Sequence, residues 1–466
     1  MNNTQRSWKS KFFGDRAFYK MILAVAIPIM IQNGITNFVN LLDNIMIGQV
    51  GTNQMSGASI VNQLIFVYNL CIFGGVSGAG IFTAQYYGQG DQEGVRNTFR
   101  FKFWLVILLT GATIVLFLLK GGSLIQLYLK GNGDPSDAAQ TLAYGLQYMK
   151  LMLIGLIPFM ISQAYSSTLR ECGETVLPMK AGVVSVLVNL VFNYLLIYGK
   201  FGFPVLGVRG AAIATALSRY VEMMIIVIFC HRDPQKYKFT QGLYKTLAVP
   251  SRLIQKIIIK GMPLLVNETL WAAGMAMLTQ CYSVRGLHVV AALNITTTIS
   301  NVFNIVFIAL GDSVAIVVGQ LLGANRMKEA RETDTRMIVF SVLCCSVVAA
   351  LMLLASPFFP RLYNTSNEVR SLATRFIMIV AIFMPQNAFL HACYFTLRSG
   401  GKTIITFLFD SVFIWCINVT LAFTLSRFTP LSVIAIFIIV QFGDSLKAIL
   451  GYILVKKGIW LNNIVS

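Results

Sequence analysis

The chain has 466 residues, of which 56% are hydrophobic and only 12% are charged, and its mean hydropathy is +0.70. A soluble globular chain carries about 25% charged residues, so this composition excludes a set of two or three soluble domains. It also excludes a disordered, collagen-like or disulfide-scaffold chain, because apolar residues are abundant and only 8 residues are Cys. The composition therefore predicts an all-α integral membrane protein.

The net charge of +19 does not indicate binding of nucleic acid. A basic surface for a phosphate backbone needs a patch or stripe of Lys and Arg. Here the basic residues lie in short clusters between apolar runs and form no stripe with interleaved aromatics. That distribution is typical of the positive-inside rule for membrane proteins. We expect no nucleic-acid partner.

Twelve apolar runs are long enough to be membrane spans, since roughly 20 residues of helix cross about 30 Å of hydrocarbon. The predicted spans are about 20–48, 55–87, 99–119, 139–169, 178–199, 210–231, 253–282, 288–322, 335–357, 371–397, 403–427 and 430–455. An even number of spans places both termini on the same side of the membrane.

Lys and Arg are concentrated on the side of the membrane that holds the termini, including the first twenty residues and the 233–252 segment. This bias predicts that both termini are cytoplasmic. No cleavable signal peptide is visible, because the N-terminus is polar and its first apolar run continues into a full span. We expect a multi-pass protein of the cytoplasmic membrane, which is the inner membrane of a cell that has two.

Cysteine and histidine give no sign of a metal site. Most cysteines lie within spans and at no zinc-ligand spacing, and the three histidines are scattered. Buried apolar thiols are the favoured interpretation. A membrane-embedded transferase would need a catalytic His or an acidic cluster in a loop, and neither appears. We expect no bound metal or cofactor and no enzymatic activity.

The sequence contains an internal repeat. Pro28 recurs as Pro263, and Gln85-Tyr-Tyr-Gly88 falls on Gln320-Leu-Leu-Gly323, both at a shift of 235 residues; Gly51 falls on Gly286 in the same way. Later, Thr168–Thr175 matches Thr396–Thr403 at a shift of 228. Agreement at a fixed shift, at several polar positions, argues against chance similarity between apolar helices.

Each repeat holds six spans, so both repeats enter and leave the membrane on the same side. Such repeats are related by a pseudo-two-fold axis along the membrane normal. We predict an N-lobe over 1–232, a cytoplasmic linker over 233–252 and a C-lobe over 253–466. Two like bundles leave a cavity between them that rocking exposes to either side, which favours a secondary transporter. No soluble nucleotide-binding domain is present, so an ion gradient would supply the energy.

Six acidic residues fall inside spans, where each costs about 2.5–3.5 kcal/mol at the bilayer centre. Glu222 lies three residues after Arg219 and Asp444 three before Lys447, so local ion pairs are expected for both. The other four have no basic neighbour at helical spacing: Asp43, Glu268, Asp312 and Asp410. We predict that these four bind the coupling ion or the substrate. A protonated carboxyl group hydrogen-bonded to a neighbouring helix is the structural alternative.

Burial disfavours the charged form of a carboxyl group, so such a group takes a proton from the acidic side of the membrane. When ionised, it can hold Na⁺ together with amide oxygens. Asn189 and Asn193, one turn apart, are the candidate amides, with hydrogen bonding between helices as the alternative. Trp271, Met275 and Met277 follow Glu268 and are candidates for lining a pocket for flat cations. Packing or contact with lipid is the alternative for these three.

Several stretches in order make the sequence similar to the multidrug and toxic compound extrusion (MATE) family. They are Pro28 through Asp43–Gly51, Gln85–Gly88, Thr168–Gly173, Asn189–Gly202 and Gly207–Thr215. The resemblance covers nearly the whole chain. It implies two six-helix lobes and export of cationic amphipathic compounds coupled to entry of H⁺ or Na⁺. We expect a monomer surrounded by membrane lipids.

The resemblance also bears on single residues. Asp43 matches the carboxylate of span 1, Asn189 the asparagine of span 5 and Glu268 the acidic residue of span 7. Asn193 and Asn387 stand where some members have Asp. Asp312 and Asp410 are candidates to supply the missing charge, so the coupling ion stays open between H⁺ and Na⁺. A flippase for lipid-linked saccharides of the same superfamily is the alternative, but its cavity should be basic to hold pyrophosphate.

Overall fold

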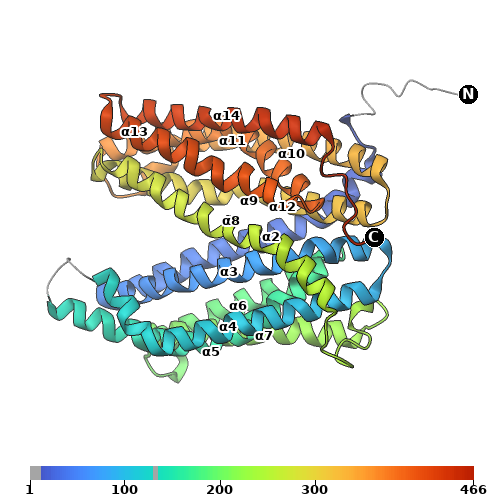
Figure 1. Cartoon of the computed structure of the whole chain (residues 1–466). Helices are drawn as coiled ribbons and strands as arrows, with labels where there is room; N and C mark the ends of the chain where they lie inside the picture. Colours follow the sequence, from blue (N-terminus) through green and yellow to red (C-terminus); the bar gives the residue numbers. More distant parts are fainter. Residues whose placement is uncertain (1–11, 130–134) are drawn as a thin grey trace, which may run out of the picture. The chain divides into compact units, whose positions relative to one another are not determined.

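Long helices dominate the computed structural model, which describes residues 12–129 and 135–466. Within those residues every regular element is helical and no strand occurs (Figure 1). The apolar runs give the reason, because a segment inside a bilayer must satisfy its backbone hydrogen bonds within itself. The predicted all-α fold is confirmed.

The predicted spans each coincide with a helical segment. The first six are α2 (Arg16–Gly48), α3 (Thr52–Gln89), α4 (Gln92–Leu129), α5 (Pro135–Glu171), α6 (Val176–Tyr198) and α7 (Val208–Arg232). The next four and the last are α8 (Ser251–Ser283), α9 (Leu287–Gly323), α10 (Met327–Ala355), α11 (Asn367–Ser399) and α14 (Val433–Lys457).

The eleventh span is built differently. It comprises α12 (Thr403–Phe407), the π-helical turns η4 (Leu408–Val412) and η5 (Ile414–Val419), and α13 (Thr420–Phe428). Three short 3₁₀ turns lie in the connections: η1 (Lys200–Gly202), η2 (Lys238–Thr240) and η3 (Phe359–Leu362). π-Helical turns are rare and occur mostly at functional sites, so the eleventh span merits inspection for bound groups.

In the described part of the chain, 11 helical segments are long and apolar enough to cross a membrane. The remaining predicted span is α8, a helix of 33 residues that is less apolar. Pro263, Asn267 and Glu268 lower its hydropathy. Polar residues inside a span are expensive and commonly functional. The one predicted span that departs from simple hydrophobicity is therefore a place to look for a site.

The contacts divide the chain into two units. We call Ile31–Thr83 with Gln92–Ile257 the N unit. The C unit comprises the described residues up to Met30, Ala84–Asp91 and Ile258–Ser466. In the N unit α7 packs along both α5 and α6, and in the C unit α11 packs along both α9 and α10. The predicted lobes 1–232 and 253–466, with their linker, follow the sequence repeat rather than these contacts, and they stay a prediction.

A reciprocal crossing within the C unit joins equivalent residues of the two repeats. A Cβ atom at Gly88 would lie 1.9 Å from the carbonyl oxygen of Gln320. A Cβ atom at Gly323 would lie 1.8 Å from the carbonyl oxygen of Gln85. The end of α3 and the end of α9 thus touch backbone to backbone through the same Gln-x-x-Gly motif. Only glycine allows this approach, which explains why the motif occurs in both repeats.

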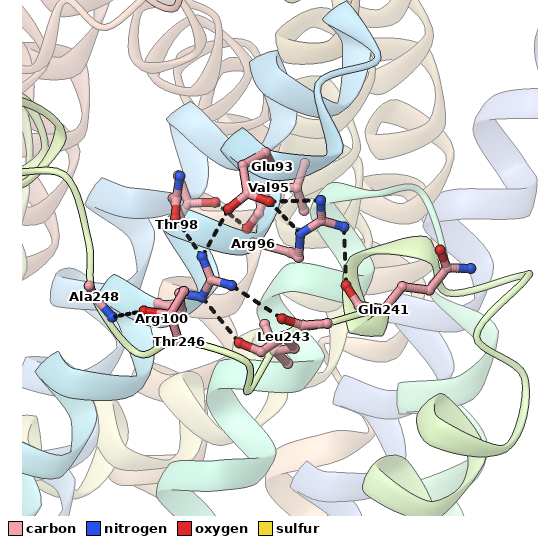
Figure 2. Close-up of polar contacts among 11 residues, drawn as sticks. Glu93, Val95, Arg96, Thr98, Arg100, Gln241, Leu243, Thr246 and Ala248 are labelled. Carbon is pink, nitrogen blue, oxygen red and sulfur yellow. Dashed lines mark hydrogen bonds and ion pairs between the residues drawn. The ribbon is translucent and has the colours of Figure 1, made fainter.

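The 233–252 segment is tied to the beginning of α4 by two arginines (Figure 2). Arg100 donates to the carbonyl oxygens of Leu243 (3.1 Å) and Gly242 (3.3 Å). Arg96 donates to the carbonyl oxygen of Gln241 (3.2 Å). Glu93 accepts from both arginines at 2.8 and 2.9 Å and holds them side by side. The predicted linker is therefore an ordered part of the N unit.

Candidate ion and substrate sites

A buried ion pair joins α14 to the eleventh span in the C unit. Lys447 on α14 donates to Oδ1 of Asp410 at 2.8 Å. The Lys447 ammonium also lies 5.1 Å from the centre of the Phe409 ring. Lys447 is only 7% exposed, so its ammonium group has lost most of its water. The carboxylate and the aromatic ring compensate for that loss.

Asn267 connects this ion pair to α8. Its amide nitrogen donates to Oδ2 of Asp410 (3.1 Å) and to the hydroxyl oxygen of Tyr394 (3.3 Å). Its amide oxygen accepts from the hydroxyl of Ser411 at 2.7 Å. Asn267 is 1% exposed, and its hydrogen bonds fix the register of α8 against the π-helical turns. Sequence reasoning missed Asn267, although it directly precedes Glu268 on the polar segment of α8.

Glu268 lies at the other end of the same network. Tyr394 on α11 donates its hydroxyl hydrogen to Oε1 of Glu268 at 3.3 Å. The polar chain therefore runs from Lys447 through Asp410, Asn267 and Tyr394 to Glu268, across four helical segments. The two carboxyl groups, predicted separately from sequence, lie in one connected site. Tyr394 was also missed, because a tyrosine within a span resembles any packed aromatic residue.

The structure corrects two expectations about charge pairing. Asp410 has no basic residue three or four positions away in its own span, but Lys447 of α14 forms an ion pair with it. The predicted pair of Lys447 with Asp444 is wrong: Asp444 accepts instead from the amide of Asn418 at 2.9 Å. Spacing along one helix shows only local neighbours, whereas the packing of α14 against the eleventh span decides which carboxylate Lys447 meets.

Arg219, expected to pair with Glu222, interacts with it electrostatically but makes its direct contacts with other groups. It donates to the carbonyl oxygen of Gly155 at 3.4 Å and lies 4.9 Å from the centre of the Phe159 ring. The geometry of these contacts is that of a guanidinium held by a backbone dipole and an aromatic face.

Two further predicted residues of the C unit lie on α9 and α11. Asp312 on α9 is half-buried and interacts electrostatically with Glu268. Asn387 is half-buried on α11, two turns before Tyr394 and on the same face of that helix.

The candidate pocket residues divide between two faces of α8. Trp271 and Met275 follow Glu268 by three and seven residues, so they share its face, and they are 38% and 45% exposed. Met277 lies nine residues after Glu268, on the opposite face, and packs against a buried apolar cluster of the C unit. The geometry is consistent with contact to a ligand for the first two and with packing for the third.

The N unit holds a second carboxyl site around Asp43 of α2. Asn193 of α6 donates its amide to Oδ1 of Asp43 at 2.5 Å. The Asn189 side chain lies 3.0 and 3.2 Å from the two Asp43 oxygens, and a carboxylate requires that its nitrogen face them. In that orientation its oxygen accepts from the hydroxyl of Thr215 on α7 (3.3 Å). Three residues predicted from sequence are thus in contact, and Thr215 was missed.

Close packing of α6 and α7 positions this amide pair. A Cβ atom at Gly210 would lie 2.6 Å from the carbonyl oxygen of Leu196, so the two helix backbones nearly touch. Asn189 and Asn193 are 5% and 1% exposed. The Oδ1 atom of Asn193 is buried without a hydrogen-bond partner. An unpartnered oxygen beside a carboxylate is suited to a proton donor or to a small hard cation, which prefers oxygen ligands.

Metal chemistry of the zinc type finds no support. Within residues 12–129 and 135–466 no group of three or more His, Cys, Asp or Glu side chains is arranged to hold a metal ion. The absence of a bound cofactor stays a prediction.

Together, the helical segments and buried carboxyl groups define a polytopic membrane protein with polar sites inside its helix bundles. Comparison with known proteins assigns it more closely. The MatE family model matches residues 28–195 and 263–424, that is, both repeats. The chain belongs to the MatE family, the multidrug and toxic compound extrusion transporters, as the sequence motifs predicted.

Named relatives match over most of their length. The chain is 26% identical over 425 residues to the "Probable multidrug resistance protein NorM" of Thermotoga maritima, covering 90% of this chain and 88% of that protein. It is 24% identical over 438 residues to the "Probable multidrug resistance protein YoeA" of Bacillus subtilis, covering 91% of each.

The fold is also that of solved transporters. A crystal structure of the Vibrio cholerae MATE transporter VcmN matches with a TM-score of 0.85 at 16% sequence identity, covering 97% of this chain and 98% of that one. At this level of identity the match shows the fold alone.

Proposed function

We propose that this protein is a secondary active multidrug exporter that exchanges cationic amphipathic compounds for H⁺ or Na⁺ by alternating access. The observation that carries the proposal is the setting of Asp43 and Glu268. Both carboxyl groups lie in membrane-spanning helices, and their hydrogen-bond donors are neutral: side-chain amides for Asp43 and a hydroxyl for Glu268. Arg398 of α11 acts electrostatically on Glu268, but among the described residues neither carboxyl group is hydrogen-bonded to a basic side chain. A carboxylate without a directly bound cation is the group that a proton, a sodium ion or a cationic substrate can neutralise.

In this proposal the Asp43 site is the ion-coupling site of the N unit. The amide donors stabilise the ionised carboxylate, and the unpartnered Oδ1 of Asn193 adds an oxygen ligand beside it. A proton or Na⁺ entering the site removes its negative charge. The ion shifts the equilibrium toward the conformation that binds it more tightly, and the size of the shift is set by the difference in affinity between the two conformations.

The Glu268 site is the proposed substrate-responsive site of the C unit. Trp271 and Met275 continue the face of Glu268 along α8 and expose aromatic and thioether surface. Such groups accept flat cations of different shapes, because methionine adapts and an aromatic face attracts positive charge. Asp312 acts electrostatically on the same carboxylate, and Asn387 lies two turns before its donor Tyr394 on the same face of α11.

The Asp410–Lys447 pair has a positioning role in this proposal. Since Lys447 already neutralises Asp410, this carboxylate is a poorer target for an external cation than Glu268. Its second oxygen holds Asn267, the residue next to Glu268. The ion pair thereby sets the position of Glu268 without binding the transported ion itself.

Membrane placement completes the proposal. The protein would lie in the cytoplasmic membrane with both termini in the cytoplasm, and it would work as a monomer without a bound cofactor. The transported compounds are its partners, together with the surrounding lipids.

A binding experiment on purified protein tests the proposal. A fluorescent lipophilic cation is titrated into wild type, Asp43→Asn and Glu268→Gln at several pH values, with and without Na⁺. We expect protons or Na⁺ to weaken cation binding to wild type, and Glu268→Gln to weaken it at least tenfold. A pyrophosphate-bearing lipid is titrated in parallel. Tight binding of that lipid with no binding of the cation would contradict the proposal and favour the flippase alternative.

A further inference from the structure

A basic cavity lies in the C unit, and its lining shares no residue with the network from Lys447 to Glu268. It has a volume of about 650 Å³ and is formed where α10 ends, through η3, and along the first turns of α11. Arg361, Arg370 and Arg375 all line it. Arg361 lies in η3, and the other two arginines lie in the first turns of α11, close in sequence to the end of α10.

The electrostatics of this cavity are one-sided. Its lining residues include three arginines and no carboxylate among the residues that the structure describes. The acidic residue nearest in sequence, Glu368, lies 3.8 Å from Nε2 of His288 instead. Three guanidinium groups around one open space repel each other, and an anion between them relieves that repulsion.

One of the three arginines is held by hydrogen bonds and the other two are exposed. Arg370 donates through Nη2 to the carbonyl oxygen of Tyr363 (3.0 Å) and through Nη1 to Oδ1 of Asn367 (3.4 Å). Arg361 is exposed, with its guanidinium 5.8 Å from the centre of the Phe358 ring. Arg375 is exposed on α11. A held guanidinium with two exposed ones beside it suits a phosphate group, which arginine binds through paired hydrogen bonds.

The rest of the lining is mixed: Asn367, Ser371 and Thr374 are polar, and the other three residues are apolar. Pro357, Pro360 and Met378 form part of the cavity wall. Leu362 of η3 is 78% exposed, and Ile382, one turn after Met378 on the same face of α11, is 64% exposed. Exposed apolar side chains at the end of a membrane span are suited to contact with acyl chains. A ligand of this cavity is therefore expected to have an anionic head and an apolar body.

We infer that this cavity binds the phosphate-bearing headgroup of an anionic phospholipid, with the acyl chains lying along the exposed apolar residues of α11. A free phosphate ion would meet the same arginines but would leave the apolar surface unused. The lipid is therefore the ligand that the combined charge and apolar surface select. This inference does not depend on the transport activity proposed above.

Native mass spectrometry of the delipidated full chain tests this inference. Phosphatidylglycerol and phosphatidylcholine with identical acyl chains are titrated into wild type and into the double variant Arg361→Gln/Arg375→Gln. We expect wild type to bind phosphatidylglycerol selectively and the double variant to bind it at least tenfold more weakly. Binding of phosphatidylcholine should be the same in both proteins.

Matched variants separate charge from folding. Arg427→Gln removes another exposed arginine that lies over an aromatic ring but outside the cavity, and it should bind like wild type. Arg361→Lys/Arg375→Lys keeps the charge and should keep selectivity for the anionic lipid. If the double glutamine variant does not fold, the single Arg375→Gln variant should still show about threefold weaker binding.

Two results would overturn the inference. One is an unchanged affinity for phosphatidylglycerol in the folded glutamine variants. The other is binding of inorganic phosphate as tight as that of the lipid, because the apolar surface would then contribute nothing.

Discussion

The two repeats place a basic residue at the same position but give it different partners. At the shift of 228 that relates Thr168–Thr175 to Thr396–Thr403, Arg219 corresponds to Lys447, and Gly182 corresponds to Asp410. In the C unit Lys447 pairs with Asp410. In the N unit no carboxylate exists at the equivalent position, and Arg219 rests on the Phe159 ring and the carbonyl of Gly155.

The packing around these positions is nevertheless retained. Asn267 of α8 contacts Asp410. Its equivalent at the shift of 235 is Gln32 of α2, whose amide lies 3.3 Å from the position of a Cβ atom on Gly182. The repeats thus share a helix contact while they differ in charge. In the C unit one carboxylate, Asp410, forms an internal ion pair, and a second one, Glu268, accepts from a hydroxyl group. In the N unit the carboxylate of Asp43 lies among side-chain amides.

The largest effect is expected from removing the carboxylates without a basic hydrogen-bond partner. Asp43→Asn and Glu268→Gln each keep an oxygen that accepts the existing hydrogen bond, so both proteins should fold. Efflux of a fluorescent cation from vesicles should fall at least tenfold in each, because the site can no longer change its charge. Asp137→Asn, at an exposed carboxylate of the N unit, is the control and should transport normally. Wild-type efflux from either site variant would contradict the assignment.

The ion pair is expected to act on stability. Lys447→Met leaves the buried Asp410 without its cation, which should lower the free energy of unfolding by on the order of 3 kcal/mol. Asp410→Asn/Lys447→Met should recover most of that loss, since both charges of the ion pair are removed together. Arg219→Met is the matched control and should cost less, because Glu222 interacts with Arg219 only electrostatically and no directly bonded carboxylate is left behind. Denaturant unfolding in detergent measures all three, and equal losses for Lys447→Met and Arg219→Met would remove the distinction between the units.

The glycine crossing offers a test of the repeat itself. Gly88→Ala and Gly323→Ala each place a Cβ atom against a backbone carbonyl, so each should destabilise the protein by about 1–3 kcal/mol. The two losses should be similar, because the residues are equivalent in the two repeats. Gly111→Ala is the control, since no atom lies within 4 Å of its Cβ position. A neutral result at only one of the two crossing glycines would show that the contact is not reciprocal.

The smallest effect is expected from Thr215→Val. This change removes the hydroxyl that donates to Asn189 but leaves the amide donors of Asp43 in place. Efflux should fall about twofold to threefold, which corresponds to less than about 1 kcal/mol. Initial rates from the same vesicle assay measure it. A loss as large as that of Asp43→Asn would make Thr215 a direct part of the ion site.

The fold was predictable from sequence to a large extent, and the sites only in part. Twenty-residue apolar runs and a fixed repeat shift determine the spans, because hydrocarbon allows a buried chain little except a helix. Asp43, Asn189 and Asn193 were also accessible, since polar residues stand out in an apolar span.

The partners were less accessible. Lys447 has a carboxylate three residues away on its own helix, and only packing shows that it meets Asp410 instead. Asn267 and Tyr394 look like ordinary packing residues until their hydrogen bonds are seen. Sequence spacing carries information along one helix, whereas these contacts join different helices.

The central claim is that carboxyl groups in both units couple export of a cation to an ion gradient. The most direct test is transport of a fluorescent cation by purified protein in proteoliposomes, with a pH gradient and a Na⁺ gradient imposed separately. We expect at least one gradient to drive transport by wild type and neither to drive it in the double variant Asp43→Asn/Glu268→Gln. Transport that ignores both gradients, or that persists in the double variant, would contradict the account.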